Sequence, residues 1–174
     1  MKVRALAVED YLPIVNQVND WWGGRQVSQL LPRLFFEHFS NTSFVLESES
    51  GQAIAFLVAF VSQTEPDLAY VHFGGVDPRE RGQGFGRKLY MALFDKLRTL
   101  GCRRVRAITS PVNHGSVSFH RKLGFHILPG DDVINGYPVQ NDLAGPGQPR
   151  ICFEILLNTA HEAISRREDV EIGN

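Results

Sequence analysis

One stretch of the sequence decides the fold: Val76-Asp77-Pro78-Arg79-Glu80-Arg81-Gly82-Gln83-Gly84-Phe85-Gly86. It joins a segment with strand character, Leu68 to Val76, to a long segment with an apolar helical stripe. Glycine lets the backbone turn tightly and approach a ligand closely. A helix that follows such a turn offers unpaired amide hydrogens and the positive end of its dipole. The sequence therefore predicts a phosphate-binding turn, with Arg81, Arg87 and Lys88 adding positive charge.

Two common nucleotide-binding motifs do not fit this turn. A P-loop ends in Gly-Lys-Ser/Thr, whereas Gly86 is followed by Arg87-Lys88-Leu89. The dinucleotide fingerprint has a different glycine spacing and an acidic residue about 20 positions further on. That neighbourhood holds Arg103-Arg104-Val105-Arg106 instead. Both nucleotide classes are therefore excluded on chemistry.

Composition and charge indicate one globular domain with an anionic ligand. The chain has 174 residues, of which 43% are hydrophobic, and no apolar run reaches the roughly 20 residues of a membrane span. Its start lacks the apolar stretch of a signal peptide. The isolated Cys102 and Cys152 favour a reducing cytoplasm, with both thiols in the core. Between Arg79 and Lys122 the net charge is +9, against −10 elsewhere, which indicates a polyanion or a solvated charged helix face.

Hydrophobic periodicity predicts a mixed α/β sheet with helices between its strands. We expect a single domain over residues 1–157 and a polar C-terminal tail over 158–174. Residues 129–149, with four glycines and four prolines, are predicted to form a long irregular loop. Strands are expected at 2–8, 43–47, 53–62, 68–76, 104–109, 125–128 and 151–157, and helices from residue 9 to about 22, over 30–39, from the glycine turn to residue 100, and over 113–123.

Two motifs in this order resemble the GNAT family of N-acetyltransferases. The stretch from Val76 to Gly86 resembles the family's motif A, whose pattern Arg/Gln-x-x-Gly-x-Gly/Ala is met by Arg81, Gly84 and Gly86. Further on, motif B is resembled by Asn113-His114-Gly115-Ser116-Val117-Ser118-Phe119-His120-Arg121-Lys122-Leu123-Gly124-Phe125. The resemblance implies an α/β fold with a mainly antiparallel central sheet of about seven strands flanked by helices.

The resemblance also implies acetyl-CoA as cosubstrate. The coenzyme A pyrophosphate would lie on the amides from Arg81 to Arg87, and the pantetheine arm would pair with the strand ending at Val76, whose amide would polarise the thioester carbonyl. Gly74-Gly75 would then mark close backbone approach, although a packing bulge explains them too. The residues expected to bind the cosubstrate are Val76, Arg81, Gly82, Gln83, Gly84, Phe85, Gly86, Arg87, Asn113, Ser116 and His120. Asn113 also suits a helix cap.

The implied reaction passes the acetyl group directly to a primary amine of a small molecule or peptide, without a covalent enzyme intermediate or a metal ion. The usual motif B tyrosine acid is replaced by His120, which either donates a hydrogen bond to sulfur or only shapes the pocket. By strand alternation Tyr70, His72 and Gly74 share one face. His72 is therefore the candidate base, unless it is a hydrogen-bonded structural histidine.

Acceptor binding is expected at the first two helices and their loop. Aromatic walls and one guanidinium would suit a small amine that carries a carboxylate. The region holds Trp21, Trp22, Arg25, Phe35 and Phe36, of which Trp21, Trp22, Arg25 and Phe36 are the candidates, although adjacent tryptophans also commonly cap a core. A second function remains open, a coenzyme A-binding regulatory module that senses acyl-CoA without turnover. The negative remainder of the chain argues against nucleic acid as a partner, and the family resemblance suggests a homodimer.

Overall fold

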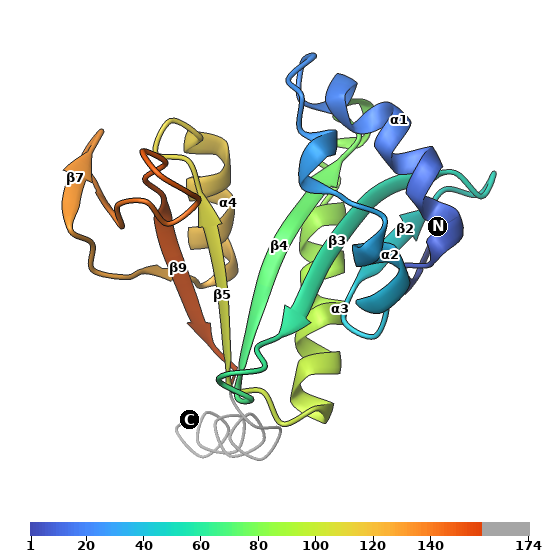
Figure 1. Cartoon of the computed structure of the whole chain (residues 1–174). Helices are drawn as coiled ribbons and strands as arrows, with labels where there is room; N and C mark the ends of the chain where they lie inside the picture. Colours follow the sequence, from blue (N-terminus) through green and yellow to red (C-terminus); the bar gives the residue numbers. More distant parts are fainter. Residues whose placement is uncertain (158–174) are drawn as a thin grey trace, which may run out of the picture. The chain divides into compact units, whose positions relative to one another are not determined.

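The computed structural model describes residues 1–157, which form two compact units (Figure 1). The first unit contains Met1–Val61 and Tyr70–Leu97, and the second contains, among the described residues, Ser62–Ala69 and residues 98–157. The expected single domain stays a prediction, and the expected tail over 158–174 lies outside the described residues. None of the described helices is long and apolar enough to cross a bilayer.

The central sheet has seven strands in the order β1-β2-β3-β4-β5-β9-β6. In the first unit, β1 (Lys2–Ala5) pairs antiparallel with β2 (Phe44–Glu47), and β2 pairs antiparallel with β3 (Ala53–Val61). The fourth strand, β4, spans Leu68–Val76. These strands and the helices that flank them confirm the α/β class expected from the sequence.

The apolar stripes of two helices build the core of the first unit. Helix α1 (Tyr11–Trp21) follows a short 3-10 turn η1 (Val8–Asp10) and buries Ile14, Val18 and Trp21 at helical spacing. Helix α3 (Phe85–Thr99) buries Leu89, Tyr90, Leu93, Phe94 and Leu97. Gly101, with a φ of 79°, follows it in the left-handed conformation expected from the sequence.

The predicted helix over 30–39 is wrong in its first half. The segment divides into a 3-10 turn η2 (Ser28–Leu30) and a short helix α2 (Leu34–His38). Leu31 between them has φ −121° and ψ 59°, outside the helical region. It precedes Pro32, whose ring disfavours the helical conformation of the residue before it.

The second unit is built on one long antiparallel pair. Strand β5 (Arg104–Thr109) pairs over its whole length with β9 (Ile151–Leu156), and β9 also pairs with β6 (His126–Ile127). Helix α4 (His114–Leu123) ends at Gly124, whose φ is 98°. These boundaries agree with those expected from the sequence to within about two residues.

The predicted irregular loop over 129–149 contains regular structure. Strands β7 (Asp132–Ile134) and β8 (Tyr137–Val139) form an antiparallel hairpin. The hairpin turns at Asn135 and Gly136, whose φ angles are 52° and 78°. Asn-Gly is the dipeptide that favours this turn, because both central residues need positive φ. The sequence signal was present, but the high glycine and proline content of the segment outweighed it.

Candidate functional site

The turn between β4 and α3 has the backbone that its glycines predict. Gly82 and Gly84 have φ angles of 81° and 80°, and a Cβ added at either would meet nothing within 4 Å. Glycine is therefore needed here for its left-handed backbone, and not for space. The 3-10 turn η3 (Pro78–Glu80) precedes these residues, and the carboxylate of Asp77 caps it by accepting the Arg79 amide at 2.9 Å.

The start of α3 can receive an anion. The Lys88 amide donates to the Gly84 carbonyl at 3.0 Å, so the amides of Phe85, Gly86 and Arg87 precede the helix's regular hydrogen bonds. Amides at this position point out of the helix end and carry the positive side of its dipole. The Arg87 and Lys88 side chains are exposed beside them. The side chain of Gln83 is occupied, since it donates to Glu80 Oε2 at 2.8 Å.

The Arg81 side chain is exposed, but two backbone carbonyls hold it in place. Its Nη2 donates to the Trp21 carbonyl at 2.7 Å, and its Nε donates to the Val76 carbonyl at 3.2 Å. The guanidinium therefore connects the end of α1 to the end of β4. Its backbone lies in the glycine turn, so only the backbone of Arg81 keeps the position expected for a phosphate ligand.

The indole of Trp22 occupies the space beside Gly75 that a side chain would fill. A Cβ at Gly75 would overlap Cη2 of Trp22 and lie 2.7 Å from its Cζ3. The Trp22 ring also lies 5.1 Å from that of Phe73, centroid to centroid. A Cβ at Gly74 would lie 2.7 Å from Cδ1 of Leu57. Close approach to these glycines is thus real, and within the first unit the nearest approaching atoms belong to side chains.

The expected face of β4 is only partly right. The Tyr70 and Phe73 rings lie 5.5 and 6.0 Å from those of Phe60 and Phe56, respectively. Phe56 and Phe60 share a face of β3, so Tyr70 and Phe73 share a face of β4 although strict alternation would separate them. Gly74, whose Cβ direction meets Leu57, lies on the other face. The alternation therefore breaks between residues 70 and 73, as at a bulge.

His72 contacts two residues of the segment that follows α1, one in the 3-10 turn η2 and one in α2. Its Nε2 lies 2.6 Å from the Leu30 carbonyl, and its ring stacks on Phe35 at 4.1 Å. A carbonyl oxygen only accepts, so the proton of the neutral ring lies on Nε2 and the lone pair on Nδ1. Phe35 and Phe73 are half-buried aromatic side chains. Phe35 lies in the region expected to bind the acceptor, whereas the sequence prediction did not include Phe73.

Two of the four predicted acceptor residues are core residues. Phe36 is 1% exposed and Trp21 is 5% exposed, and both belong to the core of the first unit. Trp22 is half-buried, and Arg25 is exposed with its Nε 3.4 Å from the Trp22 carbonyl. Asn19, which the sequence did not single out, fixes the loop: its Oδ1 accepts the amides of residues 27 and 28 at 2.8 and 2.9 Å.

The motif B residues lie together in the second unit. Asn113 caps α4 by accepting the Ser116 amide at 3.1 Å. His120 is 6% exposed and stacks on Phe153 at 4.8 Å. Its Nδ1 lies 2.8 Å from the Ser116 carbonyl, so Nδ1 carries the proton of the neutral ring. Burial lowers the pKa of His120, and the bond to the Ser116 carbonyl opposes this only in part.

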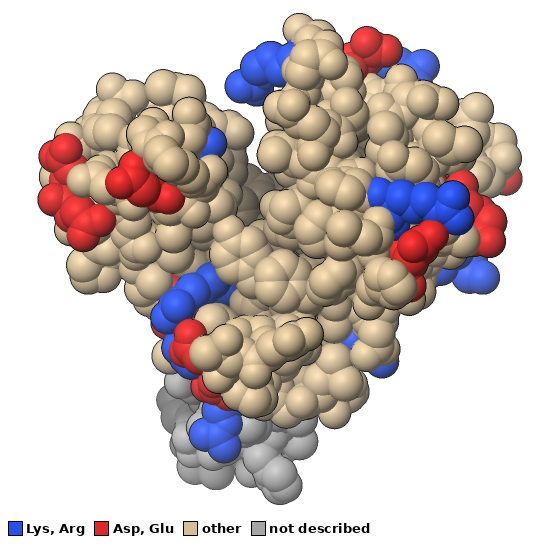
Figure 2. Space-filling model, in the orientation of Figure 1, with Lys and Arg blue, Asp and Glu red and all other residues tan. Residues whose placement is uncertain are grey.

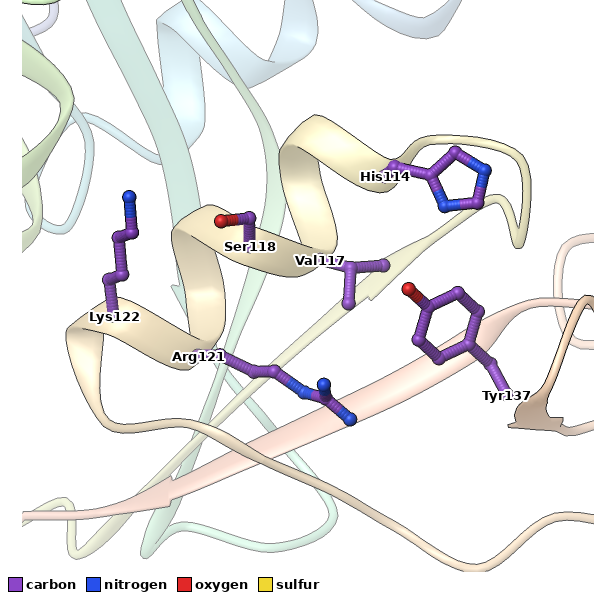
Figure 3. A pocket seen from close by; sticks show the side chains of 6 residues that line it. All are labelled: His114, Val117, Ser118, Arg121, Lys122 and Tyr137. Carbon is purple, nitrogen blue, oxygen red and sulfur yellow. The ribbon is translucent and has the colours of Figure 1, made fainter.

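A concave site that the sequence did not predict lies between α4 and the β7–β8 hairpin (Figure 3). The Arg121 guanidinium carbon is 5.8 Å from the centroid of the Tyr137 ring, and the His114 ring lies 6.1 Å from the same ring. A lining with cationic groups and no carboxylate suits an anionic group. The lining residues are His114, Val117, Ser118, Arg121, Lys122 and Tyr137.

Ion pairs neutralise much of the positive segment found in the sequence. Arg104 pairs with Glu65 and Asp67, and Arg106 pairs with Glu154. On the face shown in Figure 2, Lys and Arg are interspersed with Asp and Glu. Within residues 1–157, cations with no carboxylate partner include those at the start of α3 (Arg87, Lys88) and at the end of α4 (Arg121, Lys122). Such a distribution favours small anionic groups over an extended polyanion.

The sequence and the fold are both similar to those of known acetyltransferases. The chain is 31% identical over 85 residues to the L-2,4-diaminobutyric acid acetyltransferase of Nocardia farcinica, covering 49% of this chain and 44% of that protein. It thus spans less than half the length of this relative.

Solved structures share the fold at low sequence identity. Ard1 from Thermoplasma volcanium has a TM-score of 0.73 at 17% identity, with 90% of this chain and 97% of that chain covered. A GNAT superfamily phosphinothricin acetyltransferase from Sinorhizobium meliloti, solved in complex with AcCoA, has a TM-score of 0.68 at 18% identity, with 90% and 88% covered. A sequence model of the Acetyltransferase (GNAT) family matches residues 11–125, and the chain therefore belongs to that family.

Proposed function

We propose that this chain is an N-acetyltransferase that moves an acetyl group from acetyl-CoA directly to a primary amine of a small molecule or peptide. The observation that carries the proposal is the turn from Arg81 to Arg87, with two left-handed glycines in front of the first turn of α3. Family membership supplies the chemistry, and this backbone supplies an anion site that fits a diphosphate.

Backbone groups would bind both the diphosphate and the pantetheine arm of the coenzyme. The diphosphate would accept from the first amides of α3, with Arg87 beside them, and the pantetheine amides would follow the end of β4. The thioester oxygen would accept from the Val76 amide as the carbonyl carbon becomes tetrahedral. The amine nitrogen forms the new bond to this carbon and then releases its second proton to water. The carbon–sulfur bond breaks, and coenzyme A leaves as a thiolate.

His72 is the proposed base. Its Nε2–H is committed to the Leu30 carbonyl, and Phe35 fixes the plane of the ring. The remaining lone pair on Nδ1 can accept the proton that the ammonium group must lose before attack. After transfer, Nε2–H would keep its hydrogen bond to the Leu30 carbonyl. A base held in this way needs no rearrangement during the reaction.

The hydrogen bonding of His120 argues against the role of proton donor and leaves the role of a coenzyme A neighbour that the family resemblance implies. In the neutral ring the proton lies on Nδ1, which donates to the Ser116 carbonyl, so Nε2 presents a lone pair and only the imidazolium could donate from that nitrogen. Burial disfavours the imidazolium. The thiolate has no need of this donor, because thiols have a pKa near about 8.5 and are mostly protonated by water at neutral pH.

For the acceptor, the loop after α1 supports a small amine that carries a carboxylate. Trp22 and Phe73 supply an aromatic wall, and the exposed Arg25 guanidinium can bind the carboxylate. L-2,4-diaminobutyric acid, named for one relative, belongs to this class of amine. We further propose a cytoplasmic homodimer; the two buried free thiols, Cys102 and Cys152, suit a reducing compartment.

The test is ligand binding followed by turnover. Acetyl-CoA should raise the melting temperature, and a panel of amines with and without a carboxylate should release free thiol from it. His72→Gln should retain the melting shift and lose about 100-fold or more in kcat, as expected for a lost general base. His38→Gln is the matched control, since the His38 side chain is 70% exposed. An absent melting shift refutes the coenzyme site; a shift without thiol release from any amine refutes catalysis and supports the sensor.

A further inference from the structure

Five residues of the first unit form a closed ring of contacts. The Arg81 guanidinium donates to the carbonyls of Val76 and Trp21. Trp22, the next residue, packs its indole against Gly75, and Gly75 is bonded to Val76. The ring therefore runs from the glycine turn through the end of α1 and back along β4.

We propose that Arg81 is a positioning residue, which fixes the indole of Trp22 over Gly75 and thereby couples the coenzyme turn to the wall of the acceptor site. This inference rests on the proposed function for its catalytic consequence. The contact itself does not depend on that function. Through this contact, a residue of the phosphate-binding motif would limit the size of the amine that the enzyme accepts.

The argument begins with the carbonyl of Trp21. This carbonyl belongs to the last residue of α1, where the final carbonyls lack regular helical partners. The Trp22 amide donates to the Asn19 carbonyl at 3.1 Å, and the charged Arg81 donor at 2.7 Å holds the carbonyl side of the same peptide group. Together they fix the plane between Trp21 and Trp22, and so the direction in which the Trp22 side chain leaves the backbone. Arginine can make this contact and the one to Val76 at the same time because its donors form a planar fork.

The second step concerns the space over Gly75. The missing Cβ leaves room for the six-membered ring of the indole directly on the backbone of β4. The next residue along the strand is Val76, whose amide is the proposed polariser of the thioester. The indole is therefore a wall close to the reacting carbon, and a shift of the indole would enlarge the space that an amine can enter.

The third step is that Arg81 is not needed to hold the rest of the loop after α1. Asn19 already fixes the other end of the loop through the amides of Val27 and Ser28. Within residues 1–157, the Arg81 side chain has hydrogen bonds only to the carbonyls of Trp21 and Val76. Its contribution is thus concentrated on the two peptide groups that flank the indole and the polarising strand end.

The test compares Arg81→Lys with Arg87→Lys. Both variants retain the positive charge of the turn, but lysine lacks the planar fork with which Arg81 donates to the two carbonyls. With 5-fluorotryptophan in place of both tryptophans, the ligand-free protein should give two fluorine resonances, of which Trp22→Phe identifies one. Arg81→Lys should shift and broaden the Trp22 resonance, whereas Arg87→Lys should leave it in place.

The catalytic readout uses a compact and a bulky amine. Arg81→Lys should lower kcat/KM for the compact amine by about tenfold, the scale of a lost charged hydrogen bond, and should change the bulky amine less. Arg87→Lys should instead alter KM for acetyl-CoA without changing the ratio between the amines. Gly75→Ala should reproduce the Trp22 shift and the altered ratio without touching Arg81.

The outcomes separate the positioning of Trp22 by Arg81 from the effect of this positioning on acceptor size. An unchanged Trp22 resonance in Arg81→Lys refutes the positioning role outright. A shifted resonance with an unchanged ratio of amines refutes the coupling to acceptor size. If the wild type acetylates no amine while the resonance still shifts, the proposed function fails, the coupling to acceptor size falls with it, and only the contact stands.

Discussion

The charge state of His120 can be tested through stability. Replacing His120 by Phe retains a ring against Phe153 and removes the nitrogens that titrate. Burial lowers the pKa of His120 below the value of 6.5 for an unperturbed histidine. Below that pH the unfolded chain therefore binds a proton that the native ring does not bind, and the native state loses stability as the pH falls. Above pH 6.5 neither state binds the proton, and no slope is expected from this group.

The size of the effect follows from proton linkage. One such group contributes up to about 1.4 kcal/mol per pH unit, and at most about 2 kcal/mol between about pH 7 and about pH 5. Urea unfolding of the wild type and of His120→Phe over this range should show that the variant loses less stability on acidification. The difference between the two curves isolates this one ring, because every other group titrates in both proteins.

Activity provides the second half of this test. If His120 only packs beside coenzyme A, His120→Phe should keep kcat within about tenfold, whereas loss of a general acid costs about 100-fold or more. His120→Tyr, which restores the family's usual residue, should raise kcat if a hydroxyl donor helps the leaving thiolate. Parallel stability curves together with a large loss of kcat in His120→Phe would refute our reasoning, since they would mean a native imidazolium that acts as the acid.

Two further predictions concern the turn between β4 and α3. Gly84→Ala should destabilise the fold by about 1 kcal/mol, because alanine resists the left-handed backbone of this position, and should lower the melting temperature by about 2–4 °C. Thermal unfolding checks this. An unchanged melting temperature would contradict the conclusion that Gly84 is needed for its backbone conformation. Asp77→Asn should cost about 1–3 kcal/mol, because a buried carboxylate that accepts from Arg79 through its amide, Nε and Nη2 is lost. The Arg79 hydrogen bonds lower the pKa of Asp77 below 3.8, so this contribution should be present above that pH and disappear as the pH falls through the lowered pKa, as acid titration of both proteins would show.

The sequence predicted most of the sheet because its signals are local. The strand ending at Val76, the glycine turn and the stripe of α3 each depend on spacing along the chain, and each is confirmed. The hairpin at Asn135 and Gly136 was missed although its turn signal is equally local. Its strands have only three residues each, too few for alternation to stand out against the surrounding glycine and proline.

The candidate site was harder to predict because side-chain direction depends on contacts far apart in sequence. Phe36 was assigned to the acceptor, yet it packs edge-on against Tyr11 in the core, at 5.3 Å between centroids. Its neighbour Phe35 faces His72 instead. In a helix of five residues, one position decides between core and surface, and composition alone cannot show which aromatic residue takes which place.

The two glycine pairs show the same limit in physical terms. In the sequence, Gly74-Gly75 and Gly82-x-Gly84 both signal close backbone approach. In the structure, Gly82 and Gly84 have positive φ and open space around them, whereas a Cβ at Gly74 or Gly75 would run into Leu57 or Trp22. The first pair therefore makes room for neighbouring side chains of the protein, and the second gives the backbone a conformation that suits an anion. It follows that alanine should be costly at Gly75 through overlap with the indole and at Gly84 through the backbone, so the two substitutions should weaken different halves of the reaction: acceptor selectivity at Gly75, and coenzyme binding at Gly84.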